Sequence, residues 1–209
     1  LGNETALYYQ RRAERYCREM RAKSDKESIY HIPKELSFLE ADDAQEYLEA
    51  MKMVQKYAEL NRKIMSGRIA EFLGIDYNNS EKFTSVHNYY NFEDGIIRKG
   101  AISAKEGEKV IIPLNMRDGS ILAVGKGNKE WNYSAPHGAG RLMSRGEAKG
   151  KISLDEFERS MKGIFTTSVK NSTIDEAPMA YKTPESIMLH LEETVEVLEI
   201  IKPLYNFKA

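Results

Sequence analysis

The first third of the chain has the three- to four-residue spacing of apolar side chains that is typical of amphipathic helices. This spacing covers residues 4–21 and, in a longer series, residues 41–72. Gly74 follows the second series and is expected to end that helix. We therefore predict two helices, joined by a turn-rich connection over residues 24–33. The buried side of the second helix is predicted to consist of Tyr47, Leu48, Met51, Val54, Tyr57, Ala58, Leu60, Ile64 and Ile69.

From residue 76 onward, short apolar runs alternate with turns that contain glycine and charged residues. This alternation is typical of a sheet. A short strand is predicted over residues 83–86, and further β-like segments are expected at residues 95–98, 110–112 and 120–124. The middle of the chain is therefore expected to be a sheet region.

Two helices are predicted after the sheet region. Ser153 begins a capping-box pattern, which predicts a helix that ends near residue 161. Thr183 followed by Pro184 is a typical helix start, and this last helix is expected to run to about residue 200. Helices thus flank the sheet region on both sides along the sequence.

The amino-acid composition indicates the general class of protein. Hydrophobic residues make up 41% and charged residues 30% of the chain, and 31 Lys and Arg against 32 Asp and Glu give a net charge of −1. Any nucleic-acid site therefore needs local clustering of basic residues. The single cysteine, Cys17, excludes an intramolecular disulfide framework, and no apolar run approaches the roughly 20 residues that span a bilayer. We predict a cytoplasmic α+β protein, one domain over residues 1–209, with a mixed or antiparallel sheet region flanked by helices.

One histidine, His137, lies between a proline and a run of small residues in the stretch SAPHGAGRLMSR. Gly138 and Gly140 have no Cβ, so their backbone can adopt positive φ and let a phosphate approach closely. Arg141 and Arg145 have the four-residue spacing of one helix face, and each can bind phosphate oxygens through two N–H groups. The alternative is a glycine-rich turn before a surface helix whose arginines form surface salt bridges.

This stretch resembles a motif of the RtcB family of RNA-splicing ligases. The similarity covers most of the chain and corresponds to the C-terminal half of that family. It implies the family's fold and a ligase activity. Besides HGAGRLMSR, the residues that carry the resemblance are His87-Asn88, Arg98-Lys99-Gly100-Ala101, Asp175-Glu176-Ala177-Pro178 with Tyr181-Lys182, and Asn206-Phe207-Lys208-Ala209.

The resemblance implies a covalent mechanism with one nucleophile. His137 would take GMP from GTP and release pyrophosphate, which a histidine does as the neutral imidazole. Arg141 and Arg145 would neutralise phosphate charge on the nucleotide or on the RNA end. The nucleotide-binding residues are expected to be His87, Asn88, Pro113, Leu114, Asn115, Met116, Ser120, His137, Gly138, Ala139, Gly140 and Lys208.

Part of this set lies in the family's guanine-binding loop, where the sequence departs from the usual pattern. Leu114 and Asn115 stand where Gly-Ser is common, and Arg117-Asp118 replace Gly-Thr. Base contacts made by backbone atoms survive this change. A nucleotide site is therefore still expected in this loop.

The resemblance also implies a manganese site. His87 matches a manganese ligand of the family, whereas read alone it would be a core or loop histidine. The family's other metal ligands lie in motifs ahead of the point where this chain begins, and Cys17 lies outside any such motif. Leu1 is neither an initiator methionine nor the start of a signal peptide. We therefore expect a fragment that lacks the metal-binding half and is inactive by itself.

Four other residues are assigned no role in this chemistry. His31 and His190 match no family position, and His190 is expected to be a structural histidine of a helix. Asp175 and Glu176 are either paired carboxylates for acid–base work or, as we prefer, part of a structural turn.

Two functions from different classes fit these observations. The first, which we favour, is a monomeric GTP-dependent RNA ligase with Mn²⁺. It would join RNA 3′-phosphate or 2′,3′-cyclic phosphate ends to 5′-hydroxyl ends, in tRNA splicing or RNA repair. Whether archease, a helper protein of the family, takes part stays open. The second is a non-catalytic nucleotide- or RNA-binding module derived from such a ligase.

Overall fold

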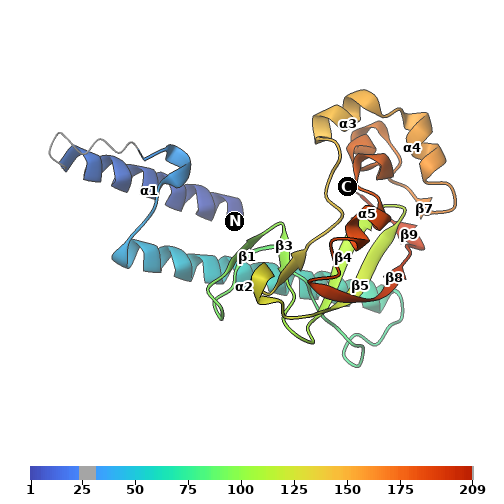
Figure 1. Ribbon diagram of the computed structural model, residues 1–209, viewed down its shortest axis with the longest axis horizontal. Helices are drawn as coiled ribbons and strands as arrows, with labels where there is room; N and C mark the ends of the chain where they lie inside the picture. The colour runs from blue at the N-terminus through green and yellow to red at the C-terminus, as the bar shows by residue number, and fades with distance from the viewer. Residues whose placement is uncertain (24–31, 209) are drawn as a thin grey trace. The chain divides into compact units, whose positions relative to one another are not determined.

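The computed structural model of the chain describes residues 1–23 and 32–208 (Figure 1). The chain divides into two compact units, Leu1–Ser80 and Glu81–Ala209. His31 and most of the predicted connection over residues 24–33 lie outside the described residues. The described residues form helices and several small, mostly antiparallel sheets, which confirms the predicted α+β class.

The first unit contains two long helices, α1 (Gly2–Lys23) and α2 (Ala41–Phe72), with a short 3-10 helix, η1 (Lys34–Leu36), before α2. Both long helices lie where the apolar spacing predicted them. Arg12 of α1 forms ion pairs with Asp43 and Glu46 of α2. Gly74 follows α2 with a φ of +69°, the left-handed conformation that commonly follows a helix end.

The predicted buried face of α2 is wrong in its C-terminal half. The side chains of Tyr57, Leu60, Ile64 and Ile69 are between 46% and 58% exposed. Contacts from α1 reach the N-terminal half of α2, where Tyr9 packs on Tyr47 and bonds to Glu46. Apolar spacing therefore located the helix, but it carries no information on how far a partner helix extends along it.

The second unit is built around a three-stranded antiparallel sheet in the order β4–β5–β8. Its strands are β4 (Lys109–Asn115), β5 (Gly119–Gly125) and β8 (Val195–Ile201). At the start of β5, Gly119 has a φ of +86°, and a Cβ there would lie 2.0 Å from the carbonyl oxygen of Ile201. Glycine at this position therefore allows β8 to pack closely against the β4–β5 turn.

The predicted helix over residues 183–200 is wrong beyond its first turns. The helix α5 (Pro184–Met188) begins as expected, with the Thr183 side chain capping it, but it is short. The following residues form β8, which pairs with β5 from Val195↔Gly125 to Ile201↔Ser120. The β-branched Val and Ile side chains of β8 favour a strand, and pairing with β5 outweighs the local helical spacing.

Three pairs of very short strands complete the second unit. The pairs are β1 (Asn88–Tyr90) with β2 (Ile97–Lys99), β3 (Ala101–Ser103) with β6 (Ser134–Pro136), and β7 (Phe165–Thr166) with β9 (Tyr205–Asn206), the last pair parallel.

The predicted strand over residues 83–86 does not form. The Ser85 hydroxyl instead accepts a single hydrogen bond from the Ile111 N–H at 3.0 Å, in place of the backbone hydrogen bonds of a strand.

Two hydrophobic cores stabilise the second unit. The first lies on the three-stranded sheet and includes Leu114 and Ile121. The second includes Met116 and Phe157 and lies among four short helices. Because Leu114 and Met116 are only two residues apart, the end of β4 connects the two cores. The helices are α3 (Arg145–Lys151), α4 (Leu154–Ser160), η3 (Asn171–Glu176) and η4 (Pro178–Ala180).

The predicted capping box of α4 is confirmed: Ser153 accepts from the Glu156 N–H, and the Glu156 carboxylate accepts from the Ser153 N–H. Among the described residues, no helix has the length and apolar character needed to cross a membrane.

Candidate active site

A cavity of about 730 Å³ lies in the second unit, where the two cores meet. Glu176 and Tyr181 line it together with most of the residues that the resemblance singled out. Asn88 does not line it, because its side-chain oxygen accepts a hydrogen bond from the Gly100 N–H at 3.2 Å. The predicted residues in its wall are His87, Pro113, Leu114, Asn115, Met116, Ser120, His137, Gly138, Ala139, Gly140, Arg141, Arg145 and Lys208.

The small-residue segment after His137 is packed against strand β4. The Ala139 N–H donates to the Pro113 carbonyl at 3.1 Å, and a Cβ on Gly138 would lie 3.0 Å from that same oxygen. Gly140 has a φ of +70°, as the sequence predicted for this segment. Both glycines are therefore required by close approach or backbone conformation.

The His137 ring is half-buried and has a defined orientation. Its Nδ1 forms a hydrogen bond with the Gly100 carbonyl oxygen. A carbonyl oxygen can only accept, so Nδ1 carries the proton and Nε2 of the neutral ring keeps its lone pair. The His87 ring stacks on His137 with centroids 4.8 Å apart and an interplanar angle of 17°. Burial lowers the pKa of His87, and the neighbouring His137 lowers it further.

The described residues do not complete a manganese site. No group of three or more His, Cys, Asp or Glu side chains among them is arranged to hold a metal ion. His87 could supply one ligand, but Mn²⁺ also requires carboxylate or other oxygen ligands. Cys17 is buried on α1, where its thiol lies 3.8 Å from the Phe38 carbonyl oxygen.

Arg141 and Arg145 do not share a helix, which corrects the interpretation from their spacing. Arg141 forms an isolated β-bridge with Tyr181, whereas Arg145 is the first residue of α3. The reason is a second capping box, in which Ser144 caps the helix and bonds reciprocally to Glu147. The helix therefore cannot extend back to Arg141.

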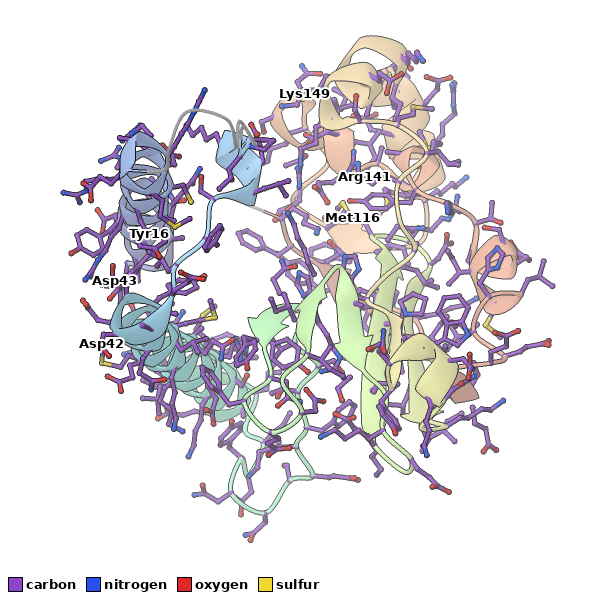
Figure 2. The ribbon with its side chains drawn as sticks, turned by 60° about the vertical axis from the view of Figure 1, so that its left-hand side comes forward. Tyr16, Asp42, Asp43, Met116, Arg141 and Lys149 are labelled. Atoms are coloured by element: carbon purple, nitrogen blue, oxygen red, sulfur yellow. The ribbon has the colours of Figure 1, made fainter. Side chains whose placement is uncertain are left out.

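Each of the three nitrogens of the Arg141 guanidinium donates a hydrogen bond within the second unit, and Figure 2 labels this side chain. Its Nε donates to the Met143 carbonyl at 3.0 Å, its Nη1 to the Tyr181 hydroxyl at 2.9 Å, and its Nη2 to the Asp175 carbonyl. It also lies over the Tyr181 ring, 4.8 Å from the centroid. Arg141 therefore joins the segment after His137 to the residues around Asp175.

Arg145 is more accessible, with 69% of its side chain exposed. Its Nη1 donates to the carboxylates of Asp175 at 2.6 Å and Glu176 at 2.8 Å. This is the salt-bridge arrangement that the sequence left as an alternative. Nη1 makes both contacts, so the hydrogen-bond donors on Nε and Nη2 are not used by this pair. Because Arg145 lines the cavity, these donors are available to a phosphate bound there.

Glu176 and Tyr181 belong to motifs that carry the resemblance, but the sequence assigned neither of them a role in the site; the structure places both in the cavity wall. The Tyr181 hydroxyl donates to Glu176 at 2.7 Å, and the Lys208 ammonium lies 3.2 Å from the same carboxylate. Burial raises the pKa of Tyr181 to about 12, with a further contribution from Glu176. Burial alone would raise the pKa of Glu176, but the Tyr181 hydrogen bond and the charge of Lys208 lower it below its ordinary value. Glu176 is therefore ionised at neutral pH.

Cationic groups outnumber carboxylates at this end of the cavity. Asp175, which lies behind the wall, and Glu176, which lines it, carry two negative charges, and four cationic side chains lie within 4 Å of them, of which all but Lys149 line the cavity. The difference, four minus two, is a local charge of +2 in a chain with a net charge of −1. Such an excess favours an anionic ligand. The four cations are Arg141, Arg145, Lys149 and Lys208.

Residues 114–118, where the sequence departs from the family's pattern, form a turn. The Asn115 and Asp118 side chains stabilise this turn. Asn115 accepts the N–H groups of Arg117 and Asp118 and donates to the Asp118 carboxylate at 2.7 Å. Leu114 and Met116 are buried in the two cores. Their side chains are thus committed to packing, and this loop offers a ligand mainly its backbone and Ser120.

The two arginines are expected to differ in their effect on stability. Arg141→Lys should lower the free energy of unfolding by about 1–3 kcal/mol, because lysine cannot reproduce three directed hydrogen bonds. Arg145→Lys should change it by about 0.5 kcal/mol or less, because the side chain is exposed. Urea denaturation of both variants measures the difference, and equal losses would contradict the structural role of Arg141.

Comparison with known proteins gives a consistent result. The sequence matches the family described as tRNA-splicing ligase RtcB over residues 1–209. It is 32% identical over 179 residues to RNA-splicing ligase RtcB of Escherichia coli (strain K12), covering 78% of this chain and 44% of that protein. It is 29% identical over 222 residues to tRNA-splicing ligase RtcB of Aeropyrum pernix, covering 90% and 45%. The chain thus spans about half the length of these relatives, and it belongs to the RtcB family.

Proposed function

We propose that this chain carries the guanylyl-transfer site of an RNA ligase, with His137 as the nucleophile. The observation that carries the proposal is the orientation of its ring. Nδ1 is committed to the Gly100 carbonyl, so the Nε2 lone pair is free at a cavity with an excess of cationic groups. A neutral imidazole nitrogen is the form that attacks phosphorus. The names of the relatives, RNA-splicing and tRNA-splicing ligase, support RNA as the substrate.

The proposed reaction has three steps. Nε2 of His137 forms a bond to the α-phosphorus of GTP while the bond to pyrophosphate breaks. An oxygen of the RNA 3′-phosphate then attacks the same phosphorus, the N–P bond breaks, and GMP is joined to the RNA end. Finally, the 5′-hydroxyl of the second RNA attacks the activated 3′-phosphate, loses its proton and releases GMP. A 2′,3′-cyclic phosphate end would first be hydrolysed to the 3′-phosphate.

The residues of the cavity have separate parts in this scheme. Arg145 and Lys208 are the accessible cations that would stabilise charge on the phosphoryl oxygens. Glu176 holds both of them by ion pairs, and Arg141 holds Tyr181 and the segment after His137. The β4–β5 turn would contact the guanine base through backbone atoms.

His87 is the residue of this chain that we propose as a manganese ligand. A bound Mn²⁺ would neutralise phosphoryl charge, and His87 would be one of its ligands. Because the described residues hold no complete set of ligands, the remaining ones would come from outside them. The second candidate function is a nucleotide- or RNA-binding module without catalysis, which the cavity and its cationic side chains would also serve.

GTP radiolabelled in its α-phosphate distinguishes the two functions. The chain is combined, in cis or in trans, with the segment that precedes the matching region in a family member, in the presence of Mn²⁺. We expect the denatured protein to retain label, and acid to remove it, as for a phosphoramidate. The chain alone should bind GTP without becoming labelled. Binding without labelling in both preparations would instead support the binding module.

A further inference from the structure

A second cavity of about 460 Å³ borders the ribbon formed by β3 and β6. Ile102 of β3 lines the first cavity, whereas its neighbour Ala101 lines the second. The same ribbon therefore contributes residues to both cavities. Pro136 lines the second cavity and directly precedes His137. Whatever binds in this second cavity therefore lies next to the nucleophile's own strand.

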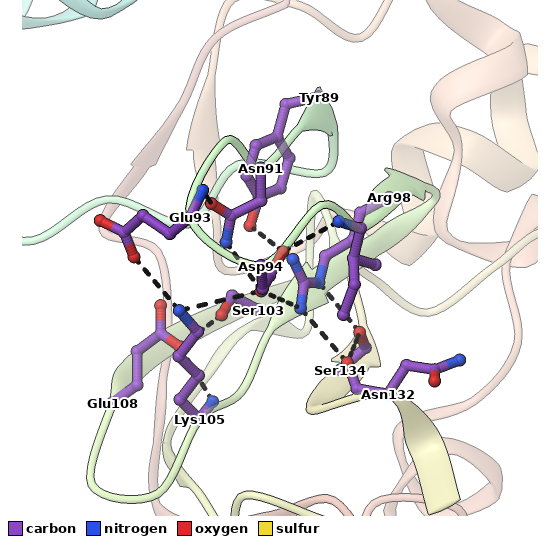
Figure 3. Close-up of polar contacts among 11 residues, drawn as sticks. Tyr89, Asn91, Glu93, Asp94, Arg98, Ser103, Lys105, Glu108, Asn132 and Ser134 are labelled. Carbon is purple, nitrogen blue, oxygen red and sulfur yellow. Dashed lines mark hydrogen bonds and ion pairs between the residues drawn. The ribbon is translucent and has the colours of Figure 1, made fainter. Parts of the chain in front are cut away.

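The wall of the second cavity combines apolar surface with three polar side chains that have no partner. Lys99, Asn132 and His190 line the cavity, and within the described part of the chain their side chains form no hydrogen bond or ion pair. In Figure 3 the Asn132 side chain extends away from the polar contacts around Arg98. An apolar wall with a few convergent polar groups is typical of a small-molecule site, and the volume lies within the usual range of about 300–1,000 Å³.

Trp131 contributes a fixed but uncovered aromatic face to this cavity. It ends the short 3-10 helix η2 (Lys129–Trp131), and its indole Nε1–H donates to the Glu193 carboxylate at 2.6 Å. The next two residues, Asn132 and Tyr133, have φ values of +50° and +52°, an unusual conformation for two consecutive non-glycine residues. The ring is nonetheless 53% exposed, and the nearby Ile97 is 77% exposed. These side chains thus contribute little to the core of the unit.

The chemistry of the wall favours an aromatic ligand. Trp131 offers a flat apolar face, and no Asp or Glu among the described residues lines the cavity. Lys99 adds a positive charge to the wall, which is compatible with the phosphates that flank a base in RNA. A nucleobase has a flat face that stacks on tryptophan and an edge of donors and acceptors. Asn132 and His190 can bond to such an edge in either direction, whereas Lys99 can only donate.

We propose that the second cavity binds an unpaired base of the RNA substrate, stacked on Trp131. This inference rests on the proposed function only in that RNA is the substrate. It adds a contact to the RNA strand that is separate from the GTP site, beside the ribbon that ends just before His137. RNA would thereby be held beside the nucleophile without competing for the nucleotide cavity.

Trp131 is the single tryptophan of the chain, so its fluorescence reports on this cavity alone. Titration of the chain with a single-stranded RNA decamer of mixed sequence should quench the emission, because the base stacks on the indole. GTP, which is proposed to bind in the other cavity, should leave it nearly unchanged. An unchanged emission at saturating RNA would overturn the proposal and indicate that another protein segment covers the ring.

Variants keep the proposal testable if the tryptophan contributes to folding. The anisotropy of a fluorescent RNA decamer should show binding about tenfold weaker to Trp131→Ala and nearly unchanged to Trp131→Phe, which keeps a stacking face. His190→Ala, at an exposed position, should weaken binding several-fold. Labelling by GTP, with each protein combined with the preceding segment of a family member and Mn²⁺, separates the two hypotheses. Variants that label and bind RNA like the parent refute only the second cavity. Weakened RNA binding by the variants, together with no labelling of the parent itself, refutes only the nucleophile.

Discussion

Replacing His137 by alanine should abolish GTP-dependent labelling of the chain when it is combined with the preceding segment of a family member and Mn²⁺. The labelling is measured as radioactivity retained after denaturation. Neither of the other two described imidazoles is placed to replace it. The stacked His87 ring is proposed as a metal ligand, and no carbonyl of the described residues orients it as Gly100 orients His137; His190 lines the second cavity. Without Nε2 there is no atom to form the bond to phosphorus. The expected change is therefore a loss to background and not a partial reduction.

His137→Asn is the matched control for this experiment. The asparagine amide can still donate a hydrogen bond towards the Gly100 carbonyl, but it is not a nucleophile. We expect this variant to keep the thermal stability of the parent chain and to remain unlabelled. Lys162→Ala, at an exposed position outside the cavity, should label like the parent. Label retained by His137→Ala would show that another residue accepts GMP.

Local sequence signals correctly predicted the helix boundaries that depend only on residues close in sequence. Apolar spacing located α2 from Ala41 to Phe72, Gly74 marked its end, and the Ser153 capping box marked the start of α4. Capping and left-handed C-terminal residues act within one or two turns, so a short window of sequence contains the cause.

The errors lie where a distant segment decides the conformation. Residues 195–201 have a spacing compatible with a helix, but the edge of β5 offers them hydrogen bonds along seven residues. The helix expected to hold both arginines begins only at Arg145, because Ser144 caps it there. The exposed apolar residues of α2 likewise depend on how far α1 extends along α2, and no local pattern contains that information.

In the candidate site, too, contiguous motifs could be predicted from the sequence, whereas contacts between distant segments could not. The resemblance identified His137 and most of the cavity wall, since these residues form contiguous motifs. The groups that orient them could not be identified in this way. The Gly100 carbonyl is a backbone atom, and Glu176 acts only because Tyr181, Arg145 and Lys208 converge on it from separate segments.

Arg98 shows most clearly how a residue in a recognised motif can have a structural role. Its side chain is 1% exposed and forms four hydrogen bonds (Figure 3). Nε donates to the Ser134 hydroxyl at 2.9 Å and Nη1 to the Tyr89 hydroxyl at 3.3 Å. Nη2 donates to the Asp94 carboxylate and to the Asn132 carbonyl, both at 3.2 Å. One guanidinium therefore holds the β1–β2 hairpin to the segment that leads through β6 to His137.

Replacing Arg98 by methionine should lower the free energy of unfolding by roughly 3–5 kcal/mol, the usual cost of removing one partner of a buried ion pair. The methionine fills much of the space but leaves the Asp94 carboxylate without its buried cation and the Ser134 hydroxyl oxygen without its donor, while the Asn132 carbonyl keeps only the hydrogen bond from Ser134. Urea denaturation followed by circular dichroism measures the loss. Because the β6 segment is no longer held, labelling of His137 should also fall.

Lys105→Met is the matched control, because Lys105 is the other cation beside Asp94, at 3.8 Å, and its side chain is 41% exposed. An exposed pair contributes about 1 kcal/mol or less, so this variant should lose far less stability than Arg98→Met. Equal losses would show that the charge of Asp94, and not the buried hydrogen bonds of Arg98, governs stability.

The acid side of the stability profile gives an independent measure of the same contact. Burial alone would raise the pKa of Asp94, but hydrogen bonds from the Ile96 N–H and Arg98 outweigh it, so the pKa lies below its ordinary value. A carboxyl group with a lowered pKa contributes stability that is present above its unfolded-state pKa and is lost as the pH falls through the folded-state pKa. In Arg98→Met the guanidinium no longer offsets the effect of burial on the pKa of Asp94. As the pH is lowered, the carboxyl group becomes protonated in both proteins, and the parent loses the stability that the contact with Arg98 contributed. The difference in free energy of unfolding between the parent and the variant should therefore shrink as the pH falls.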